Sequence, residues 1–122
     1  DANKVYYRID DPNILLLIEI MRDTQTYVCH NASSNLRLQS GIAPVLRFMD
    51  EGIRVAIGTD DPGINDDKDM FQEMRLVLRL HRVPGVEYTP PTSHQVLHMA
   101  TVNGAPLYCS LMVAESSSRS FK

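Results

Sequence analysis

The sequence predicts an α/β domain with a parallel sheet, and three observations support this fold class. Short apolar runs that suit buried strands alternate with segments whose apolar residues recur every three or four positions, as in amphipathic helices. Each strand-like run is followed by a polar loop and then by a helix-like segment, which is the order of strand–helix units in a parallel sheet. The chain has 122 residues, of which 43% are hydrophobic and 22% charged, enough for one small domain with a core.

The first half of the chain contains two expected helices and one strand. A helix begins at Pro12, which suits the first helical position, and its apolar residues are spaced by three and four as far as Met21. Residues 26–30, TYVCH, are short and β-prone and predict a buried strand. A long polar loop, which has no helical period, then leads to a second helix over 44–52 that begins at a proline and ends at a glycine.

The second half contains one more strand and two more helices. Residues 53–58, IRVAIG, predict a strand, and residues 67–82 predict a third helix. One face of that helix gathers its apolar residues and a histidine, namely Met70, Met74, Val77, Leu78 and His81. A fourth helix follows a loop, with Thr92 as its N-cap and Gly104 at its end. Only two strands are visible, and such a sheet has open edges, so the chain is expected to be a piece of a larger fold or to pair with other chains.

Composition and charge exclude several classes of function. The net charge of −3, with no basic run, argues against nucleic acid or an anionic membrane as a main partner. The N-terminal residues lack the pattern of a signal peptide, and the longest apolar run, ILLLIEI, is too short to span a bilayer. Two cysteines, Cys29 and Cys109, are too few for a disulfide framework, so a cytoplasmic location is expected.

Two polar loops follow the two predicted strands, and loops in this position carry the chemistry of parallel α/β folds. The first begins with His30 and the second with Thr59, Asp60 and Asp61. Because parallel strands end at the same edge of a sheet, a histidine and a carboxylate are expected near one pocket. Such a pair suits a divalent metal site or a proton-shuttling site.

Structural explanations of the same residues remain open. A histidine at a strand end is often a hydrogen-bonded structural residue, and Asp-Asp-Pro-Gly is a good turn sequence in which an aspartate caps the next segment. The loop asparagines, Asn31, Asn35 and Asn65, can simply satisfy backbone groups.

Two further motifs are given structural interpretations. His94 and His98 lie four apart, as in a zinc protease helix, but Gln95 stands where the catalytic Glu would be, which favours two surface histidines. Cys29 next to His30 suggests a thiol nucleophile. Adjacent strand residues point to opposite faces, so we expect Cys29 to be buried against a helix and His30 to face the pocket.

Residues 30–76, HNASSNLRLQSGIAPVLRFMDEGIRVAIGTDDPGINDDKDMFQEMRL, resemble the last two strand units of the amidohydrolase superfamily barrel. The resemblance is to the cytosine deaminase-like and chlorohydrolase-like branch, which includes methylthioadenosine/adenosylhomocysteine deaminases, guanine deaminases and triazine hydrolases. It covers residues 26 to about 106, and PTSHQVLHMATVNGA is similar to the helix that follows the barrel. The fold implied is a partial (β/α)8 TIM barrel, with the last two strand–helix units plus the following helices.

The resemblance implies a metal-dependent aminohydrolase that uses zinc or iron to activate water and displaces ammonia from a purine, pyrimidine or triazine-like ring. Asp60 matches the carboxylate at the end of the eighth strand, which binds the metal and helps to move the proton of the attacking water. His30 matches the histidine that ends the seventh strand, and it is assigned to substrate contact.

Other positions of the resemblance concern the substrate pocket. Ser34, Asn35 and Asn65 match loop positions that shape the pocket. Asp61 replaces a glycine common in this branch, and Thr-Asp-Asp-Pro is similar to adenosine deaminases, where the second aspartate contacts a purine. This favours a purine among the aminated heterocycles.

The resemblance also implies what this chain lacks. Residues 1–108 are expected to form the C-terminal part of the barrel, and residues 109–122 a divergent, disordered tail. The metal-binding histidines of the family, which lie on earlier strands, have no counterpart here, so this chain alone is expected to be inactive. The alternative is a non-catalytic half-barrel remnant that self-associates as a homo-oligomer or pairs with another fragment, such as the missing barrel half.

Overall fold

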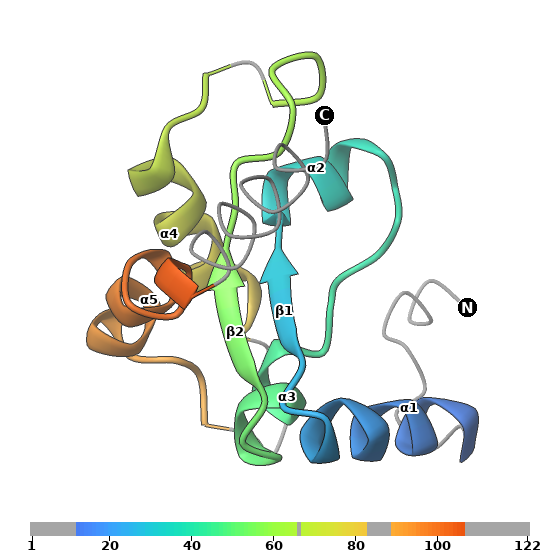
Figure 1. Ribbon diagram of the computed structural model, residues 1–122. Coiled ribbons are helices and arrows are strands. Elements are labelled where there is room, and N and C mark those ends of the chain that lie inside the picture. Colours follow the sequence, from blue (N-terminus) through green and yellow to red (C-terminus); the bar gives the residue numbers. More distant parts are fainter. Residues whose placement is uncertain (1–11, 66, 83–88, 107–122) are drawn as a thin grey trace, which may run out of the picture.

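The structure is a computed structural model that describes residues 12–65, 67–82 and 89–106, with two parallel strands flanked by helices (Figure 1). The elements, in chain order, are α1 (Pro12–Asp23), β1 (Tyr27–His30), α2 (Ala32–Arg37), α3 (Val45–Asp50), β2 (Arg54–Ile57), α4 (Met70–Leu80) and α5 (Ser93–Ala100). The expected α/β class with a parallel sheet is confirmed. The described ranges contain no closed barrel, so the partial TIM barrel stays a prediction.

The register of the two strands determines which side chains share a face. Tyr27 pairs with Arg54 and His30 pairs with Ile57, and the pairs between them alternate between the two faces. On one face the Arg54 guanidinium lies 5.2 Å from the centre of the Tyr27 ring. The other face carries Val55 and Ile57, which are both buried.

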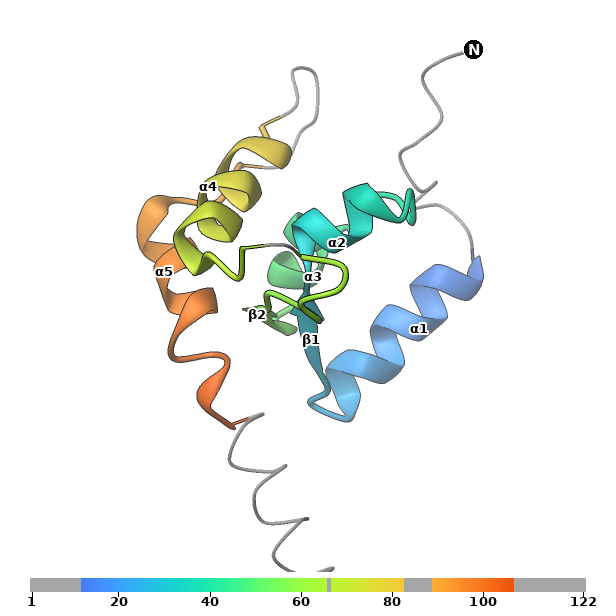
Figure 2. The ribbon, with the colours of Figure 1, turned by 90° about the horizontal axis from the view of Figure 1, so that it is seen from above.

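Helices α4 and α5 pack on each other and on β2, and Figure 2 shows both on the same side of the strands. The buried apolar cluster contains residues of β2, of the short helices α2 and α3, and of α4 and α5. It consists of Ala32, Val45, Val55, Ile57, Val77, Val96 and Met99. Burial of such apolar area is the main stabilising contribution to this small domain.

The caps of α4 and α5 explain where these helices begin. Asp69 is the N-cap of α4, and its side chain accepts hydrogen bonds from the backbone of the first turn. Thr92, as expected, is the N-cap of α5, and with Gln95 it forms a capping box. Gly52 has a φ of +73°, which is the left-handed conformation expected at the end of α3.

The expectation of one continuous loop after β1 is wrong, because residues 32–37 form the short helix α2. Its buried face consists only of Ala32 and Ser34, so the sequence shows no apolar helical period there. The backbone N–H of Ser33 donates to the Glu73 carboxylate of α4 over 3.2 Å. Glu73, 40 positions further along the chain, therefore accepts a hydrogen bond from an N–H group at the start of α2.

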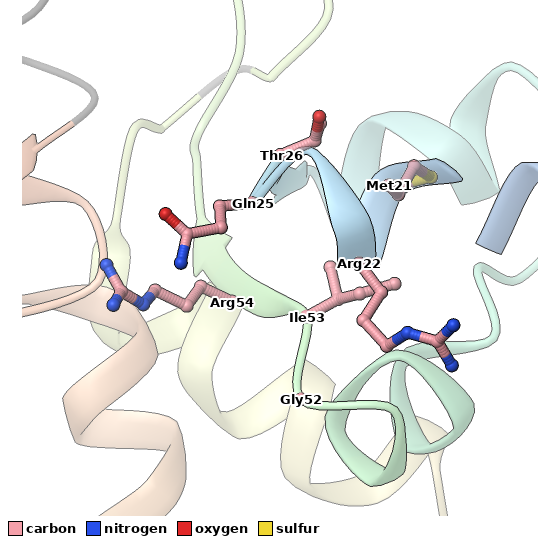
Figure 3. A pocket seen from close by; sticks show the side chains of 7 residues that line it. All are labelled: Met21, Arg22, Gln25, Thr26, Gly52, Ile53 and Arg54. Carbon is pink, nitrogen blue, oxygen red and sulfur yellow. The ribbon is translucent and has the colours of Figure 1, made fainter. Parts of the chain in front are cut away.

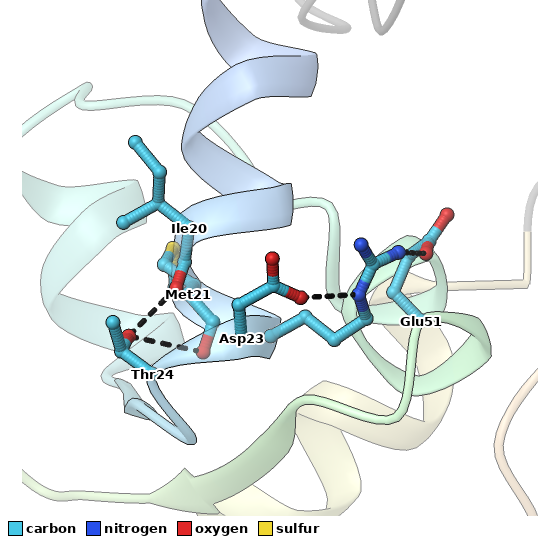
Figure 4. Close-up of polar contacts among 6 residues, drawn as sticks. Ile20, Met21, Asp23, Thr24 and Glu51 are labelled. Carbon is cyan, nitrogen blue, oxygen red and sulfur yellow. Dashed lines mark hydrogen bonds and ion pairs between the residues drawn. The ribbon is translucent and has the colours of Figure 1, made fainter.

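Helix α1 is the least buried of the described helices, with Ile18 its only buried residue. Leu16 and Leu17 are each 55% exposed. Thr24 closes the helix by donating from Oγ1 to the Ile20 carbonyl at 2.7 Å, and Arg22 bridges to Glu51 at 3.2 Å (Figure 4). Exposed ion pairs contribute little to stability, so α1 is held mainly by Ile18 and by its half-buried apolar residues, such as Ile14 and Leu15.

Two expectations lie partly or wholly outside the described residues. The tail expected over 109–122 is outside them, and so are the first 11 residues of the expected barrel segment. No helix in the described part of the chain has the length and apolar character needed to cross a membrane.

Candidate functional site

The ends of β1 and β2 lie next to each other, and Gly58 is in contact with the residues that end β1. Its backbone N–H donates to the His30 carbonyl at 3.2 Å. A Cβ atom at position 58 would lie 2.3 Å from Asn31 Oδ1 and 2.8 Å from Cys29 Sγ, closer than any real contact. The two polar loops therefore begin side by side, as the sequence predicts, and any larger residue at position 58 would require the Asn31 and Cys29 side chains to move.

Asp60 is exposed at the carboxyl end of β2, two residues beyond Gly58. Its φ is +63°, a left-handed conformation that is uncommon for residues other than glycine. Oδ1 accepts a hydrogen bond from the Asp61 N–H at 2.8 Å. Among the described residues no donor contacts the second oxygen, Oδ2, which is therefore available to a ligand.

Asp61 forms a turn immediately after Asp60. Its Oδ1 accepts from the Gly63 N–H at 2.7 Å, and its carbonyl accepts from the Asn65 N–H at 2.9 Å. The structural interpretation of Asp-Asp-Pro-Gly as a turn is thus confirmed. The Asp61 residue is exposed, so a role at a substrate stays a prediction for its remaining carboxylate oxygen.

Glu73 of α4 connects the two loops, and sequence reasoning missed it. The residue is 0% exposed, and its two oxygens accept from the Ser33 N–H and from Asn65 Nδ2, each at 3.2 Å. Asn65 is itself buried, and its hydrogen bond to Glu73 attaches the loop that begins with Asp60 to α4. A signal was present in the sequence, since Glu73, Val77 and His81 are spaced by four along the buried face of α4.

The faces expected for Cys29 and His30 are reversed in the structure. Cys29 is exposed, whereas His30 is 1% exposed and lies on the strand face that α4 and α5 cover. The alternation of strand side chains was predicted correctly, but alternation alone does not say which face the helices cover. His30 is therefore buried, whereas Asp60 at the end of the neighbouring strand is exposed. The expectation that His30 faces an open pocket is wrong for the described residues.

The surroundings of the Cys29 thiol disfavour its ionised, reactive form. Its sulfur lies against Gly58 and donates to Asn31 Oδ1 at 3.6 Å. Desolvation by these neighbours and, secondly, the negative charge of Asp60 raise the pKa of the Cys29 thiol. A raised pKa lowers the fraction of thiolate, which argues against a nucleophilic role.

His30 is paired with His81, at the end of α4, in the interior. The ring centroids are 5.6 Å apart and the ring planes are tilted by 52°. Burial lowers the pKa of His30 to about 4, and burial together with the neighbouring His30 lowers the pKa of His81 to about 4. Both rings are therefore neutral at pH 7. Neither ring nitrogen of His30 has a hydrogen-bond partner among the described residues.

Ser34 and Asn35 are on α2, and their surroundings differ. Ser34 is buried at 1% exposure, and Oγ has no hydrogen-bond partner in the described part of the chain. Asn35 lines a largely apolar hollow of about 350 Å³ whose other walls include Ile18 of α1 and Phe48 of α3. Roles for both residues in shaping a substrate pocket remain predictions.

His94 and His98 are exposed on α5, as the sequence indicates. Gln95 between them accepts the Thr92 N–H at 2.8 Å through Oε1, so the position of a protease glutamate is used here for helix capping. Within the described ranges, no three His, Cys, Asp or Glu side chains come together in a way that could hold a metal ion.

A hollow of about 130 Å³ lies at the opposite ends of the strands, where they begin (Figure 3). Residues of the α1–β1 turn, such as Gln25, and residues that lead into β2, such as Ile53, form its walls. Chemistry in parallel α/β folds is found at the carboxyl ends of strands, so we do not assign this hollow to the candidate site.

The chain is similar to a known protein family and to named members of it. A family model described as "Amidohydrolase family" matches residues 4–109. The chain is 44% identical over 88 residues to a 5'-deoxyadenosine deaminase of Methanosarcina acetivorans. It is 47% identical over 88 residues to a 5-methylthioadenosine/S-adenosylhomocysteine deaminase of Syntrophomonas wolfei.

These alignments cover most of this chain but a small part of each relative. Both include 72% of this chain and 20% of the relative's length. The chain therefore spans about a fifth of the length of the relatives that it matches. No solved structure matches the chain significantly.

Proposed function

The chain belongs to the amidohydrolase family, and on this basis we propose that it forms the last two strand–helix units of the barrel of a metal-dependent deaminase. The proposed reaction is hydrolysis of a C–N bond: water adds to an aminated ring carbon, ammonia leaves, and the ring carbon keeps the oxygen. The names of the relatives, which are deaminases of adenosine derivatives, support an adenosine-derived substrate.

The observation that carries this proposal is the position of Asp60. It is an exposed carboxylate at the carboxyl end of a parallel strand, which is where barrel enzymes carry their catalytic groups. Its left-handed backbone is a conformation that aspartate tolerates in turns and that also occurs at functional sites. In the proposed mechanism, Oδ2 of Asp60 accepts the proton of the attacking water and later delivers it to the leaving nitrogen.

The described residues do not form a metal site by themselves, because Asp60 is a single carboxylate without two further ligands nearby. Zinc sites in proteins use three or four protein ligands. Zinc or iron, when bound, would make a coordinated water acidic enough to lose a proton near neutral pH. We propose that Asp60 provides one ligand and that the remaining ligands come from parts of the protein outside the described residues.

The residues around Asp60 have proposed roles in substrate binding. Asp61 follows it directly and keeps one carboxylate oxygen, Oδ2, outside the Asx turn, so we assign Asp61 to a polar edge of the purine. Asn35, on α2, is assigned to the pocket wall, and the buried Ser34 on the same helix is assigned to the support of that wall. His30 and Asn65 are buried, which favours an indirect contribution through the positions of the loops rather than contact with the substrate.

A segment replacement tests this function with a defined reference. The segment of the Methanosarcina acetivorans deaminase that aligns with this chain is replaced by the corresponding residues of this chain, and deamination of 5'-deoxyadenosine is followed by ultraviolet absorbance. We expect the hybrid to turn over. Asp60→Asn in the hybrid should abolish turnover, whereas Asp50→Asn, at the exposed end of α3, should not. Turnover that survives Asp60→Asn would remove Asp60 from the mechanism.

The exposed apolar face of α1 favours a second candidate function, a non-catalytic chain that associates with itself or with another fragment. Leu16, Leu17 and Ile20 are each at least half exposed, and β1 and β2 pair only with each other among the described residues. Apolar patches and open strand edges of this kind promote association. Sedimentation over a hundredfold range of concentration would show an increase in mass, and Leu17→Glu should shift that increase to higher concentration.

A further inference from the structure

A network of hydrogen bonds fixes the orientation of His98 on the outer face of α5. The Asn103 side chain donates from Nδ2 to the Val55 carbonyl of β2 at 2.8 Å. A carbonyl only accepts, so this contact assigns the nitrogen and oxygen of the Asn103 amide. The other atom, Oδ1, then faces His98 Nδ1 at 3.1 Å.

This arrangement decides which nitrogen of His98 carries the proton. Because Asn103 Oδ1 is an acceptor, His98 Nδ1 must be the donor, and Nε2 of the neutral ring keeps its lone pair. The Asn103 backbone is held as well, since its N–H donates to the His98 carbonyl at 3.0 Å. Metal-binding histidines are oriented in this way by a hydrogen bond to the other ring nitrogen.

His94 lies one helical turn before His98 and supplies a second imidazole on the same face. The two ring centroids are 6.4 Å apart and the ring planes are inclined by 30°. Both residues are exposed, and among the described residues His94 has no hydrogen-bond partner that would prevent its rotation. A metal ion that bonds one nitrogen of each ring at about 2.0–2.1 Å requires these two exposed side chains to rotate toward a common point.

We propose that His94 and His98 form a two-imidazole site for a divalent transition-metal ion, with Cu²⁺ bound more tightly than Ni²⁺ or Zn²⁺. Imidazole nitrogen suits these ions, and copper is first in the general order of affinity. Water completes the coordination. The hollow beside the pair, about 260 Å³, is also lined by Arg54, whose positive charge opposes cation binding. That guanidinium is directed over the Tyr27 ring, so the opposing effect is reduced.

The site is independent of the proposed deaminase function. Asn103 contacts the middle of β2, and the hollow reaches Gly52 and Ile53, where the strand is about to begin. Asp60 lies beyond the other end of the same strand. Failure of this proposal therefore leaves the role of Asp60 untouched, and the reverse also holds.

Copper titration of the full chain tests the proposal, with Cys29→Ser and Cys109→Ser as a background that removes thiol ligands. We expect one saturable Cu²⁺ site in calorimetry, and two imidazole nitrogens in the electron paramagnetic resonance spectrum. His94→Gln and His98→Gln should each abolish it, and both positions are exposed, so the fold should be kept. Asn103→Ala should weaken binding roughly tenfold, as loss of an orienting partner does. Equal binding by the chain and the His94→Gln/His98→Gln variant would overturn the proposal.

A measurement without metal tests the orientation itself. Nitrogen NMR of the histidine side chains should show His98 in the Nδ1–H form, and Asn103→Ala should change this to a mixture of the two tautomers. A predominant Nε2–H form of His98 in the unmodified chain would also overturn the proposal, because Nε2 would then have no lone pair to offer.

Discussion

Asn65 Nδ2 donates a hydrogen bond to Glu73 Oε1 in the interior of the protein, at 3.2 Å. The other carboxylate oxygen accepts the N–H of Ser33, which lies in α2, in the segment after the first strand. One side chain of α4 thus joins the polar loops that follow both strands. The geometry of the edge that carries Asp60 therefore depends on a residue that does not lie on either loop.

We predict that Glu73→Ala destabilises the protein by about 1–3 kcal/mol, because it leaves the buried Asn65 donor and the partly buried Ser33 N–H without an acceptor. Glu73→Gln keeps one acceptor oxygen and should cost less. The measurement is the free energy of unfolding from urea titration monitored by circular dichroism.

The matched control is Glu19→Ala on the exposed face of α1, which should change stability by less than about 0.5 kcal/mol. Equal effects of the two alanine substitutions would contradict the joining role of Glu73.

The buried histidine pair makes stability depend on pH. The folded-state pKa of each ring is about 4, below the value of 6.5 for an unperturbed histidine. Between these values the unfolded chain binds more protons than the folded chain, so stability falls as pH falls. The contribution is fully present above pH 6.5 and is lost toward pH 4, with a slope of up to about 1.4 kcal/mol per pH unit for each histidine.

Urea midpoints measured between pH 7.5 and pH 5 check this dependence. His81→Leu should reduce the slope, whereas His94→Gln, on the exposed face of α5, should leave it unchanged. The same slope in the His81→Leu variant as in the unmodified chain would rule out titration of the pair as its cause.

The electrostatic effect of Asp60 on the Cys29 thiol should be measurable as thiol reactivity. Because desolvation and the charge of Asp60 both raise the pKa of Cys29, we predict slow alkylation by iodoacetamide at pH 7.5 despite its exposure. Asp60→Asn removes the smaller of the two causes and should accelerate the reaction by a modest factor. Mass spectrometry of the Cys29 peptide, in a Cys109→Ser background, gives the rate.

Asp61→Asn is the control for this experiment, since Asp61 is next in sequence but does not affect the pKa of the Cys29 thiol. If both asparagine variants accelerate alkylation equally, the effect is a general change in the loop and not the charge of Asp60.

The capping box of α5 is a separate test of local structure. Thr92→Ala should destabilise the protein by about 1 kcal/mol, because Oγ1 accepts the Gln95 N–H at 3.2 Å. Gln95→Glu preserves an acceptor for the Thr92 N–H and should be nearly neutral. Urea unfolding of both variants is compared with Ser93→Ala, and a Thr92→Ala midpoint no lower than that of Ser93→Ala would refute the cap.

Local sequence patterns predicted the helices that carry their own signals. Pro12 begins α1, Thr92 caps α5, and Gly52 ends α3, and in each case the relevant interaction lies within a few residues. Helix α2 has no such signal, because the carboxylate that binds its Ser33 N–H belongs to a residue far along the chain. Tertiary contacts of this kind are outside the reach of periodicity.

The candidate site was predicted in part for the same reason. The adjacency of the two loops follows from parallel strand order, and the turn at Asp61 follows from its sequence. The burial of His30 depends on which face of the strands α4 and α5 cover. The two-residue alternation of a strand does not predict which face that is. Glu73 was missed because a carboxylate in an apolar stripe looks like an exposed position until its two donors are known.

Gly58 has a practical consequence for anyone who wishes to alter these loops by directed evolution. Asp61 and Gly63 are exposed, but substitution of Asp61 removes the acceptor of the Gly63 N–H, and a Cβ atom at position 63 would lie 3.1 Å from Asp61 Oδ1. Any side chain at position 58 would overlap Asn31 and Cys29. A library that randomises residues 58–63 together would therefore also displace the Asn31 and Cys29 side chains, and keeping position 58 constant avoids that displacement.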